Sequence, residues 1–183
     1  MNDGSAKTFP GIYEGTVVQN IDPENRGRLI CTVPDVLGLV PTTWVECCTP
    51  LAGPTGPPMG IYFVPPIGAG VWVTFVHGNA NKPVWLGCRF GSVADVPPLA
   101  QAGLPISPNI IIQTAGQNTV MISDVPGPTG GIMLKSPMGA SIIVNDSGIY
   151  IQNGKGATIT LVGPAISVLG TPVDMNSAAL TVT

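Results

Sequence analysis

The sequence predicts an all-β protein in two parts, a small barrel followed by a repetitive β shaft. Apolar residues recur two apart through the second half, which is the period of a strand with one buried face. The 183 residues include 24 Gly and 20 Pro, which favour many turns and no long helices. All three tryptophans and all four phenylalanines occur before residue 91, so an aromatic core can form only in the first half.

The first half begins with a short arm and a hairpin. Residues 1–10 are expected to form a loose polar arm whose start, MNDGSAKT, does not resemble a signal peptide. Residues 11–21 and 28–36 are strand-like and flank the turn DPENRG, which predicts a β-hairpin. The run TTWVECC follows as a third strand.

The rest of the first half consists of a loop and two more strands. Pro and Gly are so dense in residues 49–60 that an exposed loop is expected there. Strands are predicted over 71–76 and 83–89, joined by a turn. Five short strands within residues 11–91 predict a small closed or partly open barrel. Its expected core contains Trp44, Trp72, Phe75 and Trp85.

The second half repeats one short pattern. Residues 92–108 are Pro-rich and are expected to be a linker, and residues 109–183 form the repetitive domain. Nine pairs of apolar residues two apart recur at intervals of 7 to 12 residues. The pairs are Ile110/Ile112, Val120/Ile122, Ile132/Leu134, Ile142/Val144, Ile149/Ile151, Ile159/Leu161, Ile166/Val168, Val173/Met175 and Leu180/Val182.

This pattern fits two β architectures. In one, each rung of a repetitive fold covers the next. In the other, the strands form an ordinary antiparallel meander or sandwich. A coiled coil is excluded, because the apolar residues lie at i and i+2 and Gly and Pro interrupt the run. Tyr150 is the only aromatic residue after 91, so a narrow shaft whose aliphatic side chains point to an axis shared by three chains fits best.

The composition favours self-association. Charged residues make up 9% of the chain and hydrophobic residues 44%, so something other than water is expected to cover part of the surface. No run of about 18 apolar residues is present, which argues against a membrane span. The net charge of −3 and the lack of a basic patch argue against nucleic-acid binding. Subunits that bury a common surface explain the composition better.

The cysteines are expected to be structural. Cys31, Cys47, Cys48 and Cys88 lie in apolar strand-like runs without a C-x2-C pair. Buried free thiols in a reducing cytoplasm are the favoured interpretation, and a zinc site or a disulfide is the alternative.

Candidate chemistry is sparse. His77 lies in a turn without a nucleophile or carboxylate in a recognisable motif. Gly154-Lys155-Gly156 lacks the other residues of a phosphate loop and is expected to be a turn. Asp146 and Asp174 could be sugar-binding or lyase carboxylates, but solvated turns explain them better. No catalytic, cofactor or metal site is therefore predicted.

One charged cluster has two open interpretations. Asp22, Glu24, Arg26 and Arg28 surround the predicted hairpin turn. They could form ion pairs with a neighbouring subunit or hub protein, or they could solvate the hairpin.

The chain resembles the central spike, or baseplate assembly, proteins of contractile phage tails and related injection systems. The OB-fold part of that resemblance rests on GTVVQNIDPENRGRLICTVPDV, on the strand with Trp44, and on PPMGIYFVPPIGAGVWVTFVHGNANKPVWLGCRFG. Its landmarks are Asp22-Pro23, Gly27-Arg28, Pro65-Pro66-Ile67-Gly68 and Pro83-Val84-Trp85-Leu86-Gly87. The needle part rests on DSGIYIQNGKGATITL and on VDMNSAALTVT, which are similar to the repeats of a triple-stranded β-helix.

The resemblance implies a homotrimer of an N-terminal five-stranded OB-fold barrel and a C-terminal intertwined β-helix needle, whose backbone groups pair with neighbouring chains. Ile149, Ile151, Ile159 and Leu161 are expected to face the trimer axis, and Tyr150, Gln152, Thr158 and Thr160 the outside. The full set expected on the axis is Ile132, Leu134, Ile142, Val144, Ile149, Ile151, Ile159, Leu161, Ile166, Val168, Val173 and Met175.

The function implied by the resemblance is mechanical. The spike would lie at the tip of the tail tube, where it would nucleate or cap the baseplate hub and bind hub and tube proteins. Sheath contraction would drive this membrane-piercing needle towards the outer membrane of a target cell. The chain would be assembled in the host cytoplasm into a virion baseplate or a bacterial injection particle. An OB-fold module that binds oligosaccharide or nucleic acid, and a polysaccharide-degrading β-helix, are the alternatives.

Two departures from the family pattern shape this expectation. No muramidase or peptidase segment is recognised, so cell-wall digestion would need another protein. The C-terminus also lacks the H-x-H pair with which some phage spikes hold iron. A separate PAAR-like tip protein is therefore expected to dock on Ala178, Ala179, Leu180, Thr181, Val182 and Thr183.

Overall fold

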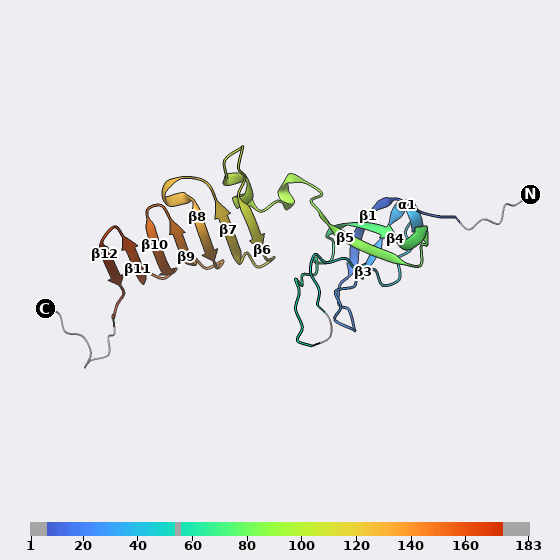
Figure 1. The fold of residues 1–183 in the computed structure, drawn as a ribbon, viewed down its shortest axis with the longest axis horizontal. Coiled ribbons are helices and arrows are strands. Elements are labelled where there is room, and N and C mark those ends of the chain that lie inside the picture. Colours follow the sequence, from blue (N-terminus) through green and yellow to red (C-terminus); the bar gives the residue numbers. More distant parts are fainter. Residues whose placement is uncertain (1–6, 54–55, 174–183) are drawn as a thin grey trace, which may run out of the picture. The chain divides into compact units, whose positions relative to one another are not determined.

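The protein is described by a computed structural model, which covers residues 7–53 and 56–173 (Figure 1). The chain divides between Asp95 and Val96 into two compact units. Both units are built from short β-strands, so the predicted all-β class is confirmed. The helical elements are short: α1 (Pro34–Leu37) and the 3-10 turns η1 (Val76–Gly78), η2 (Val93–Asp95), η3 (Pro98–Ala102) and η4 (Gly127–Thr129).

The N-terminal unit is a curled five-stranded sheet in the order β2-β1-β4-β5-β3. Its strands are β1 (Ile12–Gln19), β2 (Ile30–Thr32), β3 (Glu46–Cys47), β4 (Gly70–Phe75) and β5 (Pro83–Arg89). The strand β3 runs parallel to β5, and the other neighbours are antiparallel. Leu29, which precedes β2, exchanges two backbone hydrogen bonds with Val45, which precedes β3, at N···O distances of 3.2 and 2.7 Å. This contact brings the two edges of the sheet together, as expected of a small barrel.

The barrel encloses a compact apolar core around Trp85. Trp85 is fully buried, and its indole N–H donates to the carbonyl oxygen of Gly27 at 3.1 Å. Phe75 is also buried. The other buried residues of this core are Val17, Leu29, Cys31, Val33, Val45, Val71 and Val73.

Two of the residues expected in the core lie elsewhere. Trp72 is 38% exposed, because the alternation of β4 turns Val71, Val73 and Phe75 inward and Trp72 outward. Trp44 is half-buried, and the Arg28 guanidinium lies 5.3 Å from the centre of its ring. The prediction that Trp44 and Trp72 lie in the core is therefore wrong.

The end of the predicted N-terminal arm packs against the barrel. The Phe9 N–H donates to the carbonyl oxygen of Gly78 at 2.9 Å. Its ring centre lies 6.1 Å from that of Phe75 and 6.3 Å from that of Tyr13. At least Phe9 is therefore not part of a loose arm.

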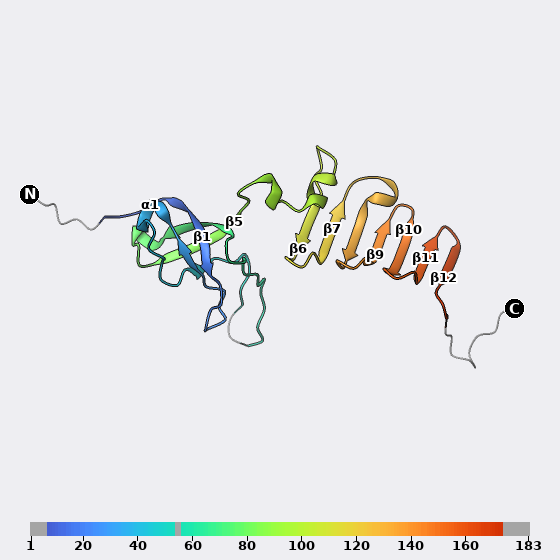
Figure 2. The same cartoon turned by 180° about the vertical axis from the view of Figure 1, so that it is seen from behind.

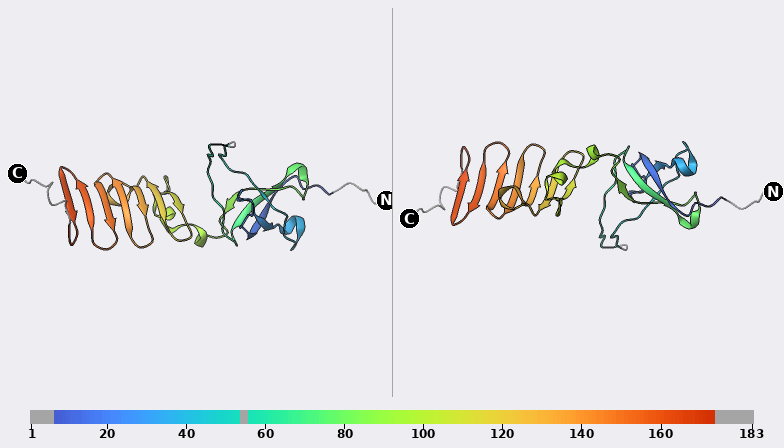
Figure 3. Two further views of the ribbon diagram at one scale, coloured as in Figure 1. Left: turned by 90° about the horizontal axis from the view of Figure 1, so that it is seen from below. Right: turned by 90° about the horizontal axis from the view of Figure 1, so that it is seen from above.

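The C-terminal unit is a seven-stranded antiparallel sheet in chain order, from β6 to β12 (Figures 1 and 2). Its strands are β6 (Ile110–Gln113), β7 (Thr119–Ser123), β8 (Gly131–Lys135), β9 (Ala140–Asn145), β10 (Gly148–Asn153), β11 (Thr158–Val162) and β12 (Ala165–Leu169). Every strand is hydrogen-bonded to its sequence neighbours, which is the meander that the sequence left open (Figure 3).

The prediction that shaft strands pair with strands of other chains is wrong for this sheet. The interior strands β7 to β11 each have a partner of the same chain on both sides. Any association through the faces of the sheet must therefore use side chains.

The predicted linker is partly ordered against the sheet. The Asn109 side-chain N–H₂ donates to the carbonyl oxygen of Leu99, in η3, at 2.7 Å. The turn η3 thereby packs against β6, and residues from Val96 onward belong to the C-terminal unit.

Candidate assembly surface

One face of the C-terminal sheet carries two unbroken rows of aliphatic side chains. Strand register places one member of each apolar pair in each row, because residues two apart point to the same face. The first row is Ile110, Ile122, Ile132, Val144, Ile149, Leu161 and Ile166. The second row is Ile112, Val120, Leu134, Ile142, Ile151, Ile159 and Val168. We call these fourteen side chains the aliphatic face.

The aliphatic face is exposed in the single chain. Its side chains range from 36% exposed at Ile149 to 72% at Ile166. Contiguous apolar patches larger than a few hundred Å² are rare on monomeric soluble proteins and mark interaction sites. The fourteen residues run across all seven strands, so this face is the strongest candidate for a functional surface.

The opposite face mixes polar and apolar side chains and is partly covered. Met121 and Met133 are buried there, at 5% and 9% exposed. The Asn145 side chain donates to the carbonyl oxygen of Pro128, in η4, at 3.1 Å, which ties that turn to β9. The Gln152 side chain donates to the Ser141 hydroxyl at 2.9 Å. This face therefore uses hydrogen bonds and covering turns within the chain, unlike the aliphatic face.

The sequence prediction of the axis residues can be compared with this register. Ten of the twelve, from Ile132 to Val168, lie on the aliphatic face. Val173 follows β12 and is 45% exposed, and Met175 lies outside the described residues, as do the tip-docking residues 178–183. The prediction omitted Ile110, Ile112, Val120 and Ile122 from the axis, although they show the same two-residue spacing.

The face predictions for β10 and β11 agree with the register. Tyr150 pairs with Thr160 and Gln152 with Thr158. These four side chains lie on the face opposite Ile149 and Ile151, because they occupy the alternate positions of the same strands.

The charged cluster of the hairpin is held together within the chain. The Arg28 guanidinium donates to the Asp22 carboxylate at 2.7 Å and also lies 2.9 Å from Glu24. Arg26 bridges Glu24 at 3.1 Å and Glu46 at 2.8 Å. The Arg28 guanidinium holds the pKa of Asp22 well below its usual range. The cluster thus organises the hairpin from within, which neither open interpretation described, since Asp22 and Arg28 are buried and their ion pairs lie inside the chain.

The other candidate residues occupy turns or surfaces. His77 is exposed at a φ of 53° in η1. Lys155 lies in the β10–β11 turn, where the Asn153 side-chain oxygen accepts its backbone N–H at 2.8 Å. Asp146 is exposed in the β9–β10 turn, and Asp174 lies outside the described residues.

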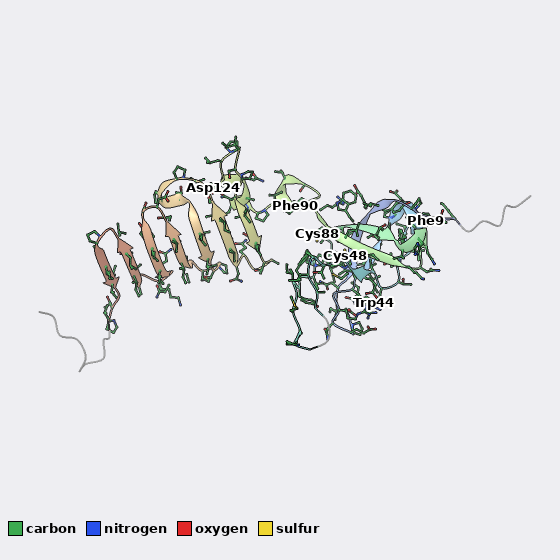
Figure 4. The ribbon with its side chains drawn as sticks, viewed as in Figure 1. Phe9, Trp44, Cys48, Cys88, Phe90 and Asp124 are labelled. Atoms are coloured by element: carbon green, nitrogen blue, oxygen red, sulfur yellow. The ribbon has the colours of Figure 1, made fainter. Side chains whose placement is uncertain are left out.

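The cysteines differ in burial. Cys31 is buried, and burial raises the pKa of its thiol to about 12. Cys47 is half-buried, whereas Cys48 and Cys88 are exposed (Figure 4). The expectation of buried thiols is therefore wrong for the last two.

Neither a metal cluster nor a spanning helix is found in the part of the chain that the structure describes. Within residues 7–53 and 56–173, no three His, Cys, Asp or Glu side chains gather as metal ligands. In the same ranges, no helix has the length and apolarity to cross a membrane.

A comparison with protein families finds one matching domain family for each of the two units. Residues 13–90 match the type VI secretion system/phage-baseplate injector OB domain, and residues 109–181 match the phage baseplate V C-terminal trimerisation domain. The chain belongs to the phage baseplate V family. Its OB-fold barrel and its aliphatic sheet are thus the two structural domains of a baseplate V protein, which acts in a phage tail or related injection particle. No curated protein matches the chain significantly.

Proposed function

We propose that this baseplate V protein is a homotrimeric central spike whose three C-terminal sheets pack with their aliphatic faces towards a common axis. The observation that carries the proposal is the exposure of all fourteen aliphatic side chains in register on one face of the single chain. Burial of an Ile, Leu or Val side chain stabilises by about 1.5–3 kcal/mol when complete, and these side chains begin about half-buried. The sum over three chains is large enough to drive association.

Three copies suit this surface better than two. The match of residues 109–181 to a trimerisation domain supports three. Three faces around one axis form a prism in which the first row of each copy lies beside the second row of its neighbour. The set proposed for the axis is the aliphatic face, together with Val173 and Met175.

The proposed role of the trimer is mechanical. A prism whose strands are already paired within each chain resists unfolding cooperatively, because separating one sheet exposes apolar side chains on all three. We propose that contraction of a sheath drives this spike through the outer membrane of a target cell, without catalysis by the chain itself. The OB-fold barrels would join the spike to hub and tube proteins during assembly in the host cytoplasm.

The tip of the spike is proposed to receive a separate PAAR-like protein on residues 178–183. The support for this site comes from the sequence, since those residues lie outside the described ranges.

Size exclusion with light scattering tests the trimer. The expected particle has three times the chain mass of 18.7 kDa. Ile151→Lys places three ammonium groups among apolar side chains on the axis, and it is expected to abolish the trimer because a buried unpaired charge is strongly destabilising.

Tyr150→Lys is the matched control for that experiment. It introduces the same charge one residue away, on the face where Tyr150 lies between Ile143 and Thr160, and the trimer should persist. A monomeric wild-type chain, or equal assembly of both variants, would contradict the proposed function.

A further inference from the structure

The C-terminal sheet has two long edges at which its strands end and its turns lie. These two edges carry opposite charges. Residues 96–173 contain only four charged side chains, Asp124, Lys135, Asp146 and Lys155. Asp124 and Asp146 follow the ends of β7 and β9, and Figure 4 shows Asp124 at the β7–β8 connection. Lys135 ends β8 and Lys155 lies in the β10–β11 turn. In a meander, alternate turns lie on opposite edges, so both aspartates lie on one edge and both lysines on the other.

The charges are also spaced equally along the stack of strands. Asp124 lies at the end of β7 and Lys135 at the far end of β8, while Asp146 lies at the end of β9 and Lys155 at the far end of β10. Lys135 is therefore one strand further along the sheet than Asp124, and Lys155 one strand further than Asp146. Neighbouring strands lie about 4.8 Å apart, so each pair is offset by that distance. A lysine side chain is long enough to cover that offset.

None of the four charges is neutralised within the described part of the chain. All four side chains are exposed, and the ion pairs found among residues 7–53 and 56–173 all lie in the N-terminal unit. The width of the sheet keeps the two edges apart, since the six residues of β10 span about 20 Å. The lysine edge can reach an aspartate edge only on another molecule.

From this geometry we propose that the lysine edge of one copy binds the aspartate edge of the next copy, head to tail around the axis. This inference rests on the proposed trimer and adds the charged contacts between its copies. Rotation about an axis along the strand stack brings unlike edges together at equal height and closes a ring. An antiparallel pairing would instead bring lysine edge to lysine edge, where like charges repel. The charge pattern therefore places two aspartates against two lysines at every boundary between copies.

Thiol crosslinking of the full chain tests the contact between the two edges directly. The variant Asp146→Cys/Lys155→Cys is made in a background with Cys48→Ser and Cys88→Ser and is treated with a bifunctional thiol reagent shorter than the width of the sheet. Head-to-tail contact predicts covalent species of up to three chains on a denaturing gel. Each single cysteine variant should stay at one chain, as should the background protein. Dimers from Lys155→Cys alone would overturn the proposal, because they require lysine edges to meet.

Charge reversal provides the second test. Lys155→Glu and Asp146→Lys should each raise the chain concentration needed for half-maximal trimer by on the order of tenfold. Each substitution removes one ion pair at all three boundaries between copies of the trimer. The double variant Lys155→Glu/Asp146→Lys restores opposite charges and should recover assembly. Lys82→Glu, in the N-terminal unit, is the control for net charge.

The outcomes separate this inference from the proposed function. A wild-type trimer that Ile151→Lys disrupts but that single charge reversals leave unchanged would overturn the edge contact and keep the aliphatic prism. A wild-type monomer would overturn the prism itself.

Discussion

At Asp22 a single carboxylate organises the turn between β1 and β2. It accepts backbone N–H groups from Glu24, Arg26 and Arg28 at 3.0, 2.8 and 3.3 Å, as well as the Arg28 guanidinium. Hydrogen bonds to the charged form favour ionisation, which lowers the pKa of this buried carboxyl from its ordinary value of 3.8. The turn is thus stabilised by a residue that the sequence placed in the predicted turn without indicating these hydrogen bonds.

The low pKa of Asp22 predicts a pH-dependent contribution to stability. A carboxyl whose pKa is lower in the folded state stabilises the fold above the unfolded-state pKa, and this stability is lost as pH falls through the folded-state pKa. The difference in free energy of unfolding between wild type and Asp22→Asn should therefore be constant at neutral pH and shrink below about pH 3.8. Urea unfolding followed by tryptophan fluorescence measures it.

The control for Asp22 is Asp35→Asn, which changes an exposed carboxyl in α1. It should leave stability nearly unchanged at neutral pH. An Asp22→Asn protein as stable as wild type at pH 7 would show that the turn does not depend on the charge.

At the scale of the element, the sheet from β6 to β12 depends on backbone positions that only glycine can occupy. Gly131 begins β8 with a φ of 86°. A Cβ atom there would collide with the carbonyl oxygen of Val144 in the neighbouring strand β9. The close approach of these two strands therefore requires a residue without a side chain.

Gly131→Ala is expected to destabilise the C-terminal unit by about 1–3 kcal/mol or more, from backbone strain together with the clash. The midpoint of urea unfolding, followed by far-UV circular dichroism at one chain concentration, should fall. Gly87→Ala is the comparison, because a Cβ atom at Gly87 meets nothing within 4 Å. Equal midpoints for the two variants would contradict the geometry at Gly131.

At the scale of the whole molecule, the two units carry different spectroscopic reporters. Trp44, Trp72 and Trp85 all lie in the N-terminal unit, whereas strands of both units contribute to circular dichroism. The aliphatic face gives the C-terminal unit a surface that the proposed association would bury. Its stability should therefore depend on chain concentration by mass action.

Two-probe unfolding tests that expectation. As chain concentration rises, we expect the transition seen by circular dichroism to move to higher urea. The transition seen by tryptophan fluorescence should move less. Ile151→Lys should remove the concentration dependence from the first probe and leave the second near its original midpoint. Coincident, concentration-independent transitions would contradict association through the C-terminal sheet.

The sequence predicted some elements well and others poorly for identifiable reasons. Alternation at Ile149 and Ile151 marks the aliphatic face because strand periodicity is local. The prediction for Trp72 is wrong because its aromatic character suggests burial. In the structure its neighbours Val71 and Val73 point into the core, so Trp72 points out. The packing of Phe9 on Phe75 was missed because it joins residues distant in the chain.

The sequence alone determined the all-β class, the confinement of aromatic residues to one unit and the two-residue period of the other, since these follow from local geometry and composition. Only the tertiary structure decided that the strands pair within one chain as a meander, since hydrogen-bond partners are not encoded in the period itself. The meander in turn aligns seven pairs into one exposed face and sorts Asp124 and Asp146 from Lys135 and Lys155 onto opposite edges. Register converts a repeated local pattern into a surface, and register is a property of the folded sheet.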